Sequence, residues 1–137
     1  IAAAIAAQAS IVFAQNKPEA VVYKDPYCGC CAGYAAHLQA AGYAVTIHDH
    51  DDMAAVKRQF SVPESLESCH TVLIDGYVVE GHVPLATLAR LLEERPDLIG
   101  IALPGMPVGT PGMEGPKSEP FVTLGFDEDG IAIYQVE

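Results

Sequence analysis

The sequence predicts a single α/β domain in which a mixed β-sheet is flanked by helices. Three observations indicate this class. The chain has 137 residues, a length that suits one domain with its own core. From residue 20 onward, short apolar runs alternate with segments of helical spacing, and turn signals separate them. Half of the residues are apolar and 18% are charged, so the chain is not expected to be disordered throughout.

Strand and helix alternate in the first half of the predicted domain. Asp25-Pro26 stops the first strand, and Gly42 closes the first helix. Asp51-Asp52 is a favourable helix start because carboxylates suit the positive end of the helix dipole. The predicted elements are a buried strand over 20–23, a helix over 32–41, a strand over 43–48 and a helix that runs to about residue 60.

The second half is predicted to end in strands. Asp75-Gly76 is a hairpin turn signal, Pro84 opens a helix, and 127–130 is a second turn. The predicted elements are strands over 71–74 and 77–80, a helix over 85–94, a loop over 103–120 and a C-terminal β-hairpin of strands 121–126 and 131–136. The loop is rich in Gly and Pro and contains two Met, which indicates an ordered loop or a lid.

The order of the first seven elements is that of a thioredoxin-like domain. The second strand is expected to return parallel to the first through a right-handed crossover. The Gly/Pro/Met-rich loop and the C-terminal β-hairpin are additions to that arrangement.

Residues 1–15 carry no charge and consist mostly of Ala and Ile. We interpret them as the remnant of a secretory signal peptide, because an apolar stretch gives way abruptly to the polar residues 15–18. An Ala-rich N-terminal helix is the alternative. Residues 16–137 would then form one mature domain outside the cytoplasm, where thiols are oxidised unless a metal or a partner protects them.

Three of the four cysteines lie within four positions. Cys28 and Cys31 have the C-x-x-C spacing of thiol oxidoreductases, and the start of a helix favours a reactive thiolate. A simple redox pair has no use for Cys30, and a bond between adjacent Cys30 and Cys31 would be strained. Cys69 precedes strand 71–74, where thioredoxin-like proteins usually place a cis-proline that faces the C-x-x-C. We therefore expect Cys69 to face the other three.

Four convergent sulfurs are soft ligands that suit Cu(I), Zn(II) or an iron–sulfur cluster. The spacing does not match the paired C-x-x-C elements of structural zinc sites. Bridging thiolates can serve several Cu(I) ions at once, so a metal site is one interpretation. A thiol–disulfide oxidoreductase and a domain held by two plain disulfides remain the alternatives.

Histidines and methionines extend the list of candidate ligands. His37 and His70 are candidate partners of a metal, although His37 suits a partly buried helix position equally well. Met106 and Met113 could cap a soft Cu(I) site, and hydrophobic packing of the loop is the alternative. His82 is expected to be structural and to cap the helix that follows it.

The charge of the chain excludes one class of partner. Seven Lys and Arg stand against 18 Asp and Glu, which gives a net charge of −11 without a basic stripe. A nucleic-acid partner is not expected, because phosphate backbones are held by clustered cations. No apolar run approaches the roughly 20 residues that a membrane span requires.

The motifs resemble a bacterial family of unknown function that includes the periplasmic copper-resistance protein CopG. The resemblance extends in order over about residues 20–115. Its motifs are residues 23–31, 37–38, 68–71, 76–77, 80–84, 104–107 and 111–114. Small departures are Tyr34, where many members have Trp, and Thr110, where Ser is common; neither is a proposed ligand.

The resemblance implies a thioredoxin-like fold, a periplasmic location and a copper cluster with more than one Cu(I) ion. It implies Cys28, Cys30, Cys31 and Cys69 as bridging ligands, and it adds four further candidates: Met106, Met113, His37 and His70. A role in copper resistance follows, by sequestration and by cycling between Cu(I) and Cu(II), with other periplasmic copper-handling proteins as partners. A thiol–disulfide oxidoreductase that uses Cys28 and Cys31 remains the alternative.

Overall fold

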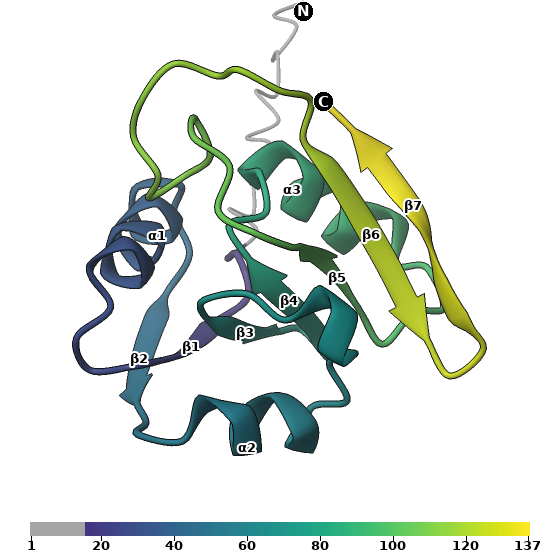
Figure 1. Cartoon of the computed structure of the whole chain (residues 1–137), viewed down its shortest axis with the longest axis horizontal. Coiled ribbons are helices and arrows are strands. Elements are labelled where there is room, and N and C mark those ends of the chain that lie inside the picture. Colours follow the sequence, from purple (N-terminus) through teal and green to yellow (C-terminus); the bar gives the residue numbers. More distant parts are fainter. Residues whose placement is uncertain (1–15) are drawn as a thin grey trace, which may run out of the picture.

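A computed structural model describes residues 16–137, which form a seven-stranded mixed sheet and three α-helices (Figure 1). The strands are β1 (Ala20–Lys24), β2 (Val45–Asp49), β3 (Thr71–Ile74), β4 (Tyr77–Gly81), β5 (Gly100–Leu103), β6 (Val122–Asp127) and β7 (Gly130–Val136). The helices are α1 (Gly29–Ala40), α2 (Met53–Gln59) and α3 (Leu85–Glu94), with a short 3₁₀ helix η1 (Glu64–Leu66). The predicted signal-peptide remnant, residues 1–15, lies outside the described residues.

The strands lie in the order β2-β1-β3-β4-β5-β6-β7. β1 pairs with β2 in parallel and β4 with β5 in parallel, while the other neighbouring pairs are antiparallel. The expected parallel return of the second strand is therefore confirmed, as is the mixed α/β class. The thioredoxin-like assignment stays a prediction.

The sheet is covered on both faces. α1 and α3 lie across one face, and α2 lies across the other (Figure 1). The larger core joins α1 and α3 to the sheet through Tyr34, Leu38, Leu88 and Leu91. A smaller cluster occupies the opposite face around Phe126. Full burial of each large apolar side chain contributes roughly 1.5–3 kcal/mol, so the larger cluster fixes α1 and α3 against the sheet and the smaller one fixes the segment that follows α2.

One strand was missed from the sequence. Residues 100–103 form β5 beside β4, although we expected the loop to begin at Leu103. A run of four apolar residues is too short for periodicity to assign, and only pairing with β4 makes it a strand. Gly100 is required there, because a Cβ atom would lie 2.0 Å from the Val78 carbonyl oxygen.

α1 begins at Gly29, three residues earlier than predicted, with Cys28 as its N-cap residue. Cys30 and Cys31 therefore lie in the first helical turn. The expected start at residue 32 was wrong because no conventional capping residue marks this end of the helix. Within the described chain, the Cys28 side chain makes no capping hydrogen bond.

The loop between β5 and β6 returns to α1 (Figure 1). Gly112 makes the close contact: a Cβ atom there would lie 2.6 Å from the Cys30 carbonyl oxygen and 2.8 Å from the Tyr34 nitrogen. Its φ of +86° also favours glycine. His37 Nε2 lies 2.9 Å from Glu114 Oε1 and joins the helix to the loop a second time. The loop is therefore docked beside the cysteines.

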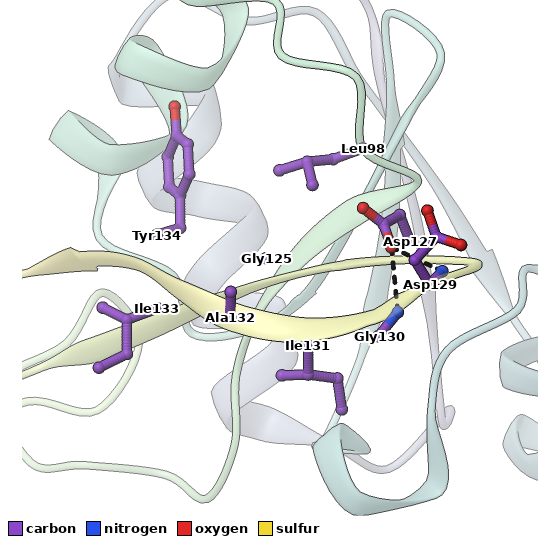
Figure 2. Close-up of a pocket in the computed structure, with 9 residues that line it drawn as sticks. All are labelled: Leu98, Gly125, Asp127, Asp129, Gly130, Ile131, Ala132, Ile133 and Tyr134. Atoms are coloured by element: carbon purple, nitrogen blue, oxygen red, sulfur yellow. Dashed lines mark hydrogen bonds between the residues drawn. The ribbon is translucent and has the colours of Figure 1, made fainter.

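β6 and β7 form the far edge of the sheet, and Figure 2 shows the open pocket of about 310 Å³ beside their turn. Asp127 closes the turn, since its Oδ1 accepts hydrogen bonds from the backbone N–H groups of Asp129 (2.8 Å) and Gly130 (3.1 Å). Ile131 and Ile133 remain 46% and 67% exposed.

Among residues 16–137, no helix has the length and apolar character to cross a membrane.

Candidate metal centre

Three segments of the chain meet at the cysteines. The first is the start of α1, where the Cys28 N–H donates to the Asp25 carbonyl oxygen (3.1 Å) and fixes the turn after β1. The second is the segment before β3, which carries Cys69 and His70. The third is the end of β4 and the residue after it, His82. The β5–β6 loop borders them through Gly112.

The four sulfur atoms lie together. Cys28 and Cys31 form a disulfide, and Cys30 Sγ lies 3.5 Å from Cys28 Sγ and 3.9 Å from Cys69 Sγ. The expected convergence of Cys69 on the other three cysteines is confirmed. The disulfide joins the C-x-x-C pair, and Cys30 and Cys69 are free thiols. The structure therefore contradicts the interpretation that the four cysteines form two disulfides.

The His70 side chain is fully buried and packs against two neighbouring rings. Its ring packs on the Tyr34 ring, with centroids 4.5 Å apart, and meets the His82 ring edge-on at 4.8 Å. Among the described residues, neither ring nitrogen has a hydrogen-bond partner. A neutral imidazole has one donor and one acceptor nitrogen, and leaving such a group unpaired in the interior costs about 1–3 kcal/mol.

The position of His70 suits a ligand. One of its nitrogens lies within 4.8 Å of the sulfurs of Cys31 and Cys69. Burial holds the pKa of His70 well below its usual range, and the neighbouring His82 and the Lys57 ammonium act in the same direction. The neutral ring therefore keeps a lone pair for a metal ion, and its two unpaired nitrogens fit that use.

His82 was assigned the wrong environment from the sequence. It does not cap α3, whose N-cap is Pro84. Instead its Nε2 lies 3.5 Å from Cys69 Sγ, and its Nδ1 lies 2.7 Å from the Pro111 carbonyl oxygen. A carbonyl can only accept, so Nδ1 carries the hydrogen and Nε2 presents its lone pair toward the sulfur. A hydrogen bond of this kind is what orients a metal-binding histidine.

A signal for His82 was present in the sequence. The 71–74 and 77–80 strands were predicted to pair, and the structure pairs Thr71 with Glu80. Continuing that register places the residues before β3 beside the residues after β4. His82 consequently lies opposite Cys69, and the predicted pairing could have identified it.

The other candidates lie around this group. His37 is outside the described clusters of metal-ligating side chains and is paired with Glu114. Met106 is 52% exposed and lines an open pocket of about 340 Å³ together with Cys69. Met113 follows Gly112, and its backbone closes a turn with Thr110 (2.9 Å). Metal ligation by His37, Met106 and Met113 stays a prediction.

The protonation of Cys69 affects metal uptake. Burial raises the pKa of this thiol to about 11, and the neighbouring Cys30 contributes, while the Ser68 hydroxyl and the Lys57 ammonium act in the opposite direction. At neutral pH the metal-free site therefore holds Cys69 as a thiol. Binding of a thiophilic metal would release its proton.

Comparisons with known proteins identify the family of this chain. Residues 66–113, which include Cys69, His70 and His82, match a family model described as "Protein of unknown function, DUF411". The chain is similar to two solved structures of a protein named copper resistance protein CopG, forms 2 and 1. Each is 45% identical in sequence and covers 88% of this chain and 98% of its own, with TM-scores of 0.82 and 0.81. No curated protein matches the sequence. The chain therefore belongs to the DUF411 family of copper resistance protein CopG.

Proposed function

We propose that this protein binds copper as Cu(I) through the thiolates of Cys28, Cys30, Cys31 and Cys69. We propose that it holds more than one ion and serves copper resistance in the periplasm. The chain's similarity to a copper resistance protein supports the choice of metal. Residues 1–15, with the composition of a signal-peptide remnant, support the location.

The donor set favours copper in its reduced state. Thiolate sulfur is a soft ligand that prefers Cu(I), and hard cations such as Mg²⁺ prefer oxygen. Cys30 Sγ lies 3.5 Å from Cys28 Sγ and 3.9 Å from Cys69 Sγ, so the free thiol is next to two other sulfurs. A sulfur in that position suits the bridging of neighbouring ions.

The observation that best supports a metal site is the environment of His70. A fully buried imidazole with two unpaired nitrogens is unfavourable in a protein without a ligand, and this one lies against two cysteines. We propose His70 and His82 as nitrogen ligands or close neighbours of the copper. His82 is oriented for this role by the Pro111 carbonyl.

The Cys28–Cys31 disulfide affects how the site can take up copper. Four thiolates require that the Cys28–Cys31 disulfide first be reduced. A thiol reductant would supply two electrons and two protons to give two thiols, and the copper would displace the protons. Re-forming the disulfide from two thiolates releases two electrons, which would reduce two Cu(II) ions to Cu(I), and this supports the proposed cycling of copper.

Copper stoichiometry tests the proposal. The reduced protein, titrated with Cu(I) under anaerobic conditions, is expected to take up more than one ion per chain, and Cys69→Ser is expected to lower that number. Met106→Leu and Met113→Leu test the two thioethers, and Met53→Leu on α2 is the matched control. Uptake of no more than one weakly held ion would contradict a cluster.

A second candidate function follows from the disulfide itself. Cys28 and Cys31 form a C-x-x-C disulfide at the N-terminus of α1, which is the arrangement of a thiol–disulfide oxidoreductase. That function predicts turnover of a mixed-disulfide substrate and tolerance of Cys30→Ser. Loss of copper tolerance in cells that carry Cys30→Ser would exclude a simple dithiol mechanism.

A further inference from the structure

A buried ion pair lies beside the cysteine site. Lys57 on α2 is 4% exposed, Glu80 on β4 is fully buried, and the Lys57 ammonium contacts Glu80 Oε1. Burying two opposite charges carries a desolvation penalty that their attraction often fails to exceed. The pair is therefore not explained by stability alone, and the contacts of its carboxylate indicate another role.

Both oxygens of Glu80 hold the segment that carries Cys69. Oε1 accepts a hydrogen bond from the Ser68 N–H (2.8 Å), and Oε2 accepts one from the Thr71 hydroxyl (2.6 Å). Ser68 and Thr71 flank Cys69 and His70, so one carboxylate holds the chain on both sides of them, through a backbone N–H on one side and a side-chain hydroxyl on the other. Lys57 adds a bond to Thr71 Oγ1 (3.2 Å), which completes a closed network.

The same segment is attached to its neighbours. The Ser68 hydroxyl donates to the Gly105 carbonyl oxygen (2.7 Å), which precedes Met106. The Gly81 N–H donates to the His70 carbonyl oxygen (3.0 Å). Cys69 Sγ lies 3.9 Å from Cys30 Sγ and 3.5 Å from His82 Nε2. This position depends on the hydrogen bonds that hold residues 68–71, two of which Glu80 accepts.

A second lysine–carboxylate pair provides the contrast. Lys24 lies 2.9 Å from Asp49, but the Asp49 side chain is 53% exposed and belongs to the edge strand β2. Within the described chain, the hydrogen bonds of this pair do not reach the segment that carries Cys69, since the Lys24 ammonium donates to the Asp25 carbonyl oxygen, which also accepts the Cys28 N–H. Lys24–Asp49 therefore serves as a matched control for the reactivity of Cys69.

We infer that the Lys57–Glu80 pair positions Cys69: Glu80 holds the Ser68 backbone and the Thr71 side chain on either side of Cys69, and Lys57 compensates the buried charge of Glu80. The consequence for copper rests on the proposed function, whereas the positioning itself is independent of any metal. Glu80 and Lys57 are positioning residues, since they act through Cys69.

The test compares two double variants that both remove the charges. Lys57→Met/Glu80→Leu also removes the acceptor of the Ser68 N–H, while Lys57→Met/Glu80→Gln keeps an amide oxygen in its place. In metal-free, oxidised protein, the rate of Cys69 alkylation, followed by peptide mass spectrometry, is expected to rise several-fold in the Leu variant. The Gln variant should stay near wild type, and Cys30 in the same sample is the internal reference.

Copper binding provides the second readout. The Leu variant, once reduced, is expected to lose about 10–100-fold in Cu(I) affinity, the range seen when partners that orient metal ligands are removed. Lys24→Met/Asp49→Asn should leave Cys69 alkylation unchanged. If the Leu variant does not fold, Thr71→Val, which removes the hydroxyl bonded to Glu80 Oε2, should raise Cys69 alkylation to a smaller extent.

The outcomes separate the two proposals. A folded Leu variant with wild-type Cys69 alkylation overturns the positioning role, as does a Gln variant that fails to restore it. Should Cys69 become more reactive as expected while the wild-type protein binds no copper, the positioning role stands and the proposed function fails.

Discussion

The cysteine site and the β6–β7 edge of the sheet both present an open hollow to solvent, but they differ in how their polar groups are satisfied. The hollows are similar in size, about 340 Å³ beside Cys69 and about 310 Å³ beside the β6–β7 turn. At the cysteine site, His70 has two unpaired nitrogens and two thiols are free. The size of a hollow is therefore a poor guide to function here.

The polar groups around β7 bond to one another. The Tyr134 hydroxyl donates to Glu94 Oε2 (3.0 Å), Arg90 Nε donates to Glu94 Oε1 (2.8 Å), and Arg90 also reaches the Tyr134 carbonyl oxygen (3.1 Å). The Asp127 carboxylate is used by its own turn, as Figure 2 shows. Among residues 16–137, the buried Thr123 hydroxyl on β6 is the exception at this edge, since it has no hydrogen-bond partner, whereas the cysteine site has two unpaired His70 nitrogens and two free thiols. The contrast indicates that the cysteine site has more groups available to bind a ligand.

Removal of the Cys30 sulfur should have the largest effect on the difference in copper binding between the two regions. Cys30 Sγ lies next to both Cys28 Sγ and Cys69 Sγ, so Cys30→Ser is expected to remove at least one Cu(I) ion per chain in an anaerobic titration. Ile133→Ser, at an exposed position on β7, should leave the stoichiometry unchanged. Equal copper uptake by the wild type and Cys30→Ser would remove Cys30 from the proposed site.

Substitution of His70 should change stability and binding in opposite directions. His70→Phe replaces a ring with two unpaired nitrogens by an apolar ring that can still pack on Tyr34. The free energy of unfolding of the metal-free protein, measured by denaturant titration, is expected to rise by about 1–3 kcal/mol. Cu(I) affinity should fall. A variant that loses stability while retaining wild-type copper affinity would show that His70 is a structural residue.

The same histidine predicts a pH dependence in the metal-free protein. Burial, with His82 and Lys57, places the pKa of folded His70 below the unfolded value of about 6.5. Below pH 6.5 the unfolded chain binds a proton that the folded chain does not, so stability falls as pH decreases toward the folded pKa. This contribution is absent above pH 6.5, where both states are neutral.

The wild type should therefore lose up to about 1.4 kcal/mol per pH unit more than His70→Phe below pH 6.5. Denaturant titrations at several pH values measure the difference. His48→Gln, at an exposed position on β2, is the control and should follow the wild-type curve. Parallel curves for the wild type and His70→Phe would show that His70 does not titrate as expected.

The smallest effect is expected at the β6–β7 turn. Asp127→Ala removes the acceptor of two backbone N–H groups in an exposed turn, and the net loss should be about 0.5–1.5 kcal/mol in the free energy of unfolding. Copper stoichiometry and affinity should not change. A change in copper binding would show that the two regions are coupled rather than independent.

Local pattern was enough to predict most of the elements. β3 and α3 have the predicted bounds, and Asp52 caps α2 through a bond from the Ala55 N–H (3.0 Å), as its position before the helix suggested. β5 was missed because its four residues become a strand only by pairing with β4. The early start of α1 was missed because cysteine is not a usual capping residue.

The candidate site was only partly predictable. The convergence of Cys69 followed from the predicted topology, and His70 from its place beside Cys69. His82 was given a structural role because its neighbours in sequence suggest a helix cap. The pairing of His37 with Glu114 had no signal in the sequence, and ligation by His37 stays a prediction. The Lys57–Glu80 pair has no local signal, since its residues are 23 positions apart and on different elements.

The sequence alone determined the crowding of three cysteines at one helix start, because spacings of one to three residues confine those sulfurs to a single turn whatever the rest of the chain does. The tertiary structure decided which distant groups join them. The pairing of Thr71 with Glu80 places His82 opposite Cys69, and the packing of Tyr34 against the sheet buries His70 beside the sulfurs. Such contacts depend on strand register and on burial in a shared core, which are set by non-local pairing and not by any short segment.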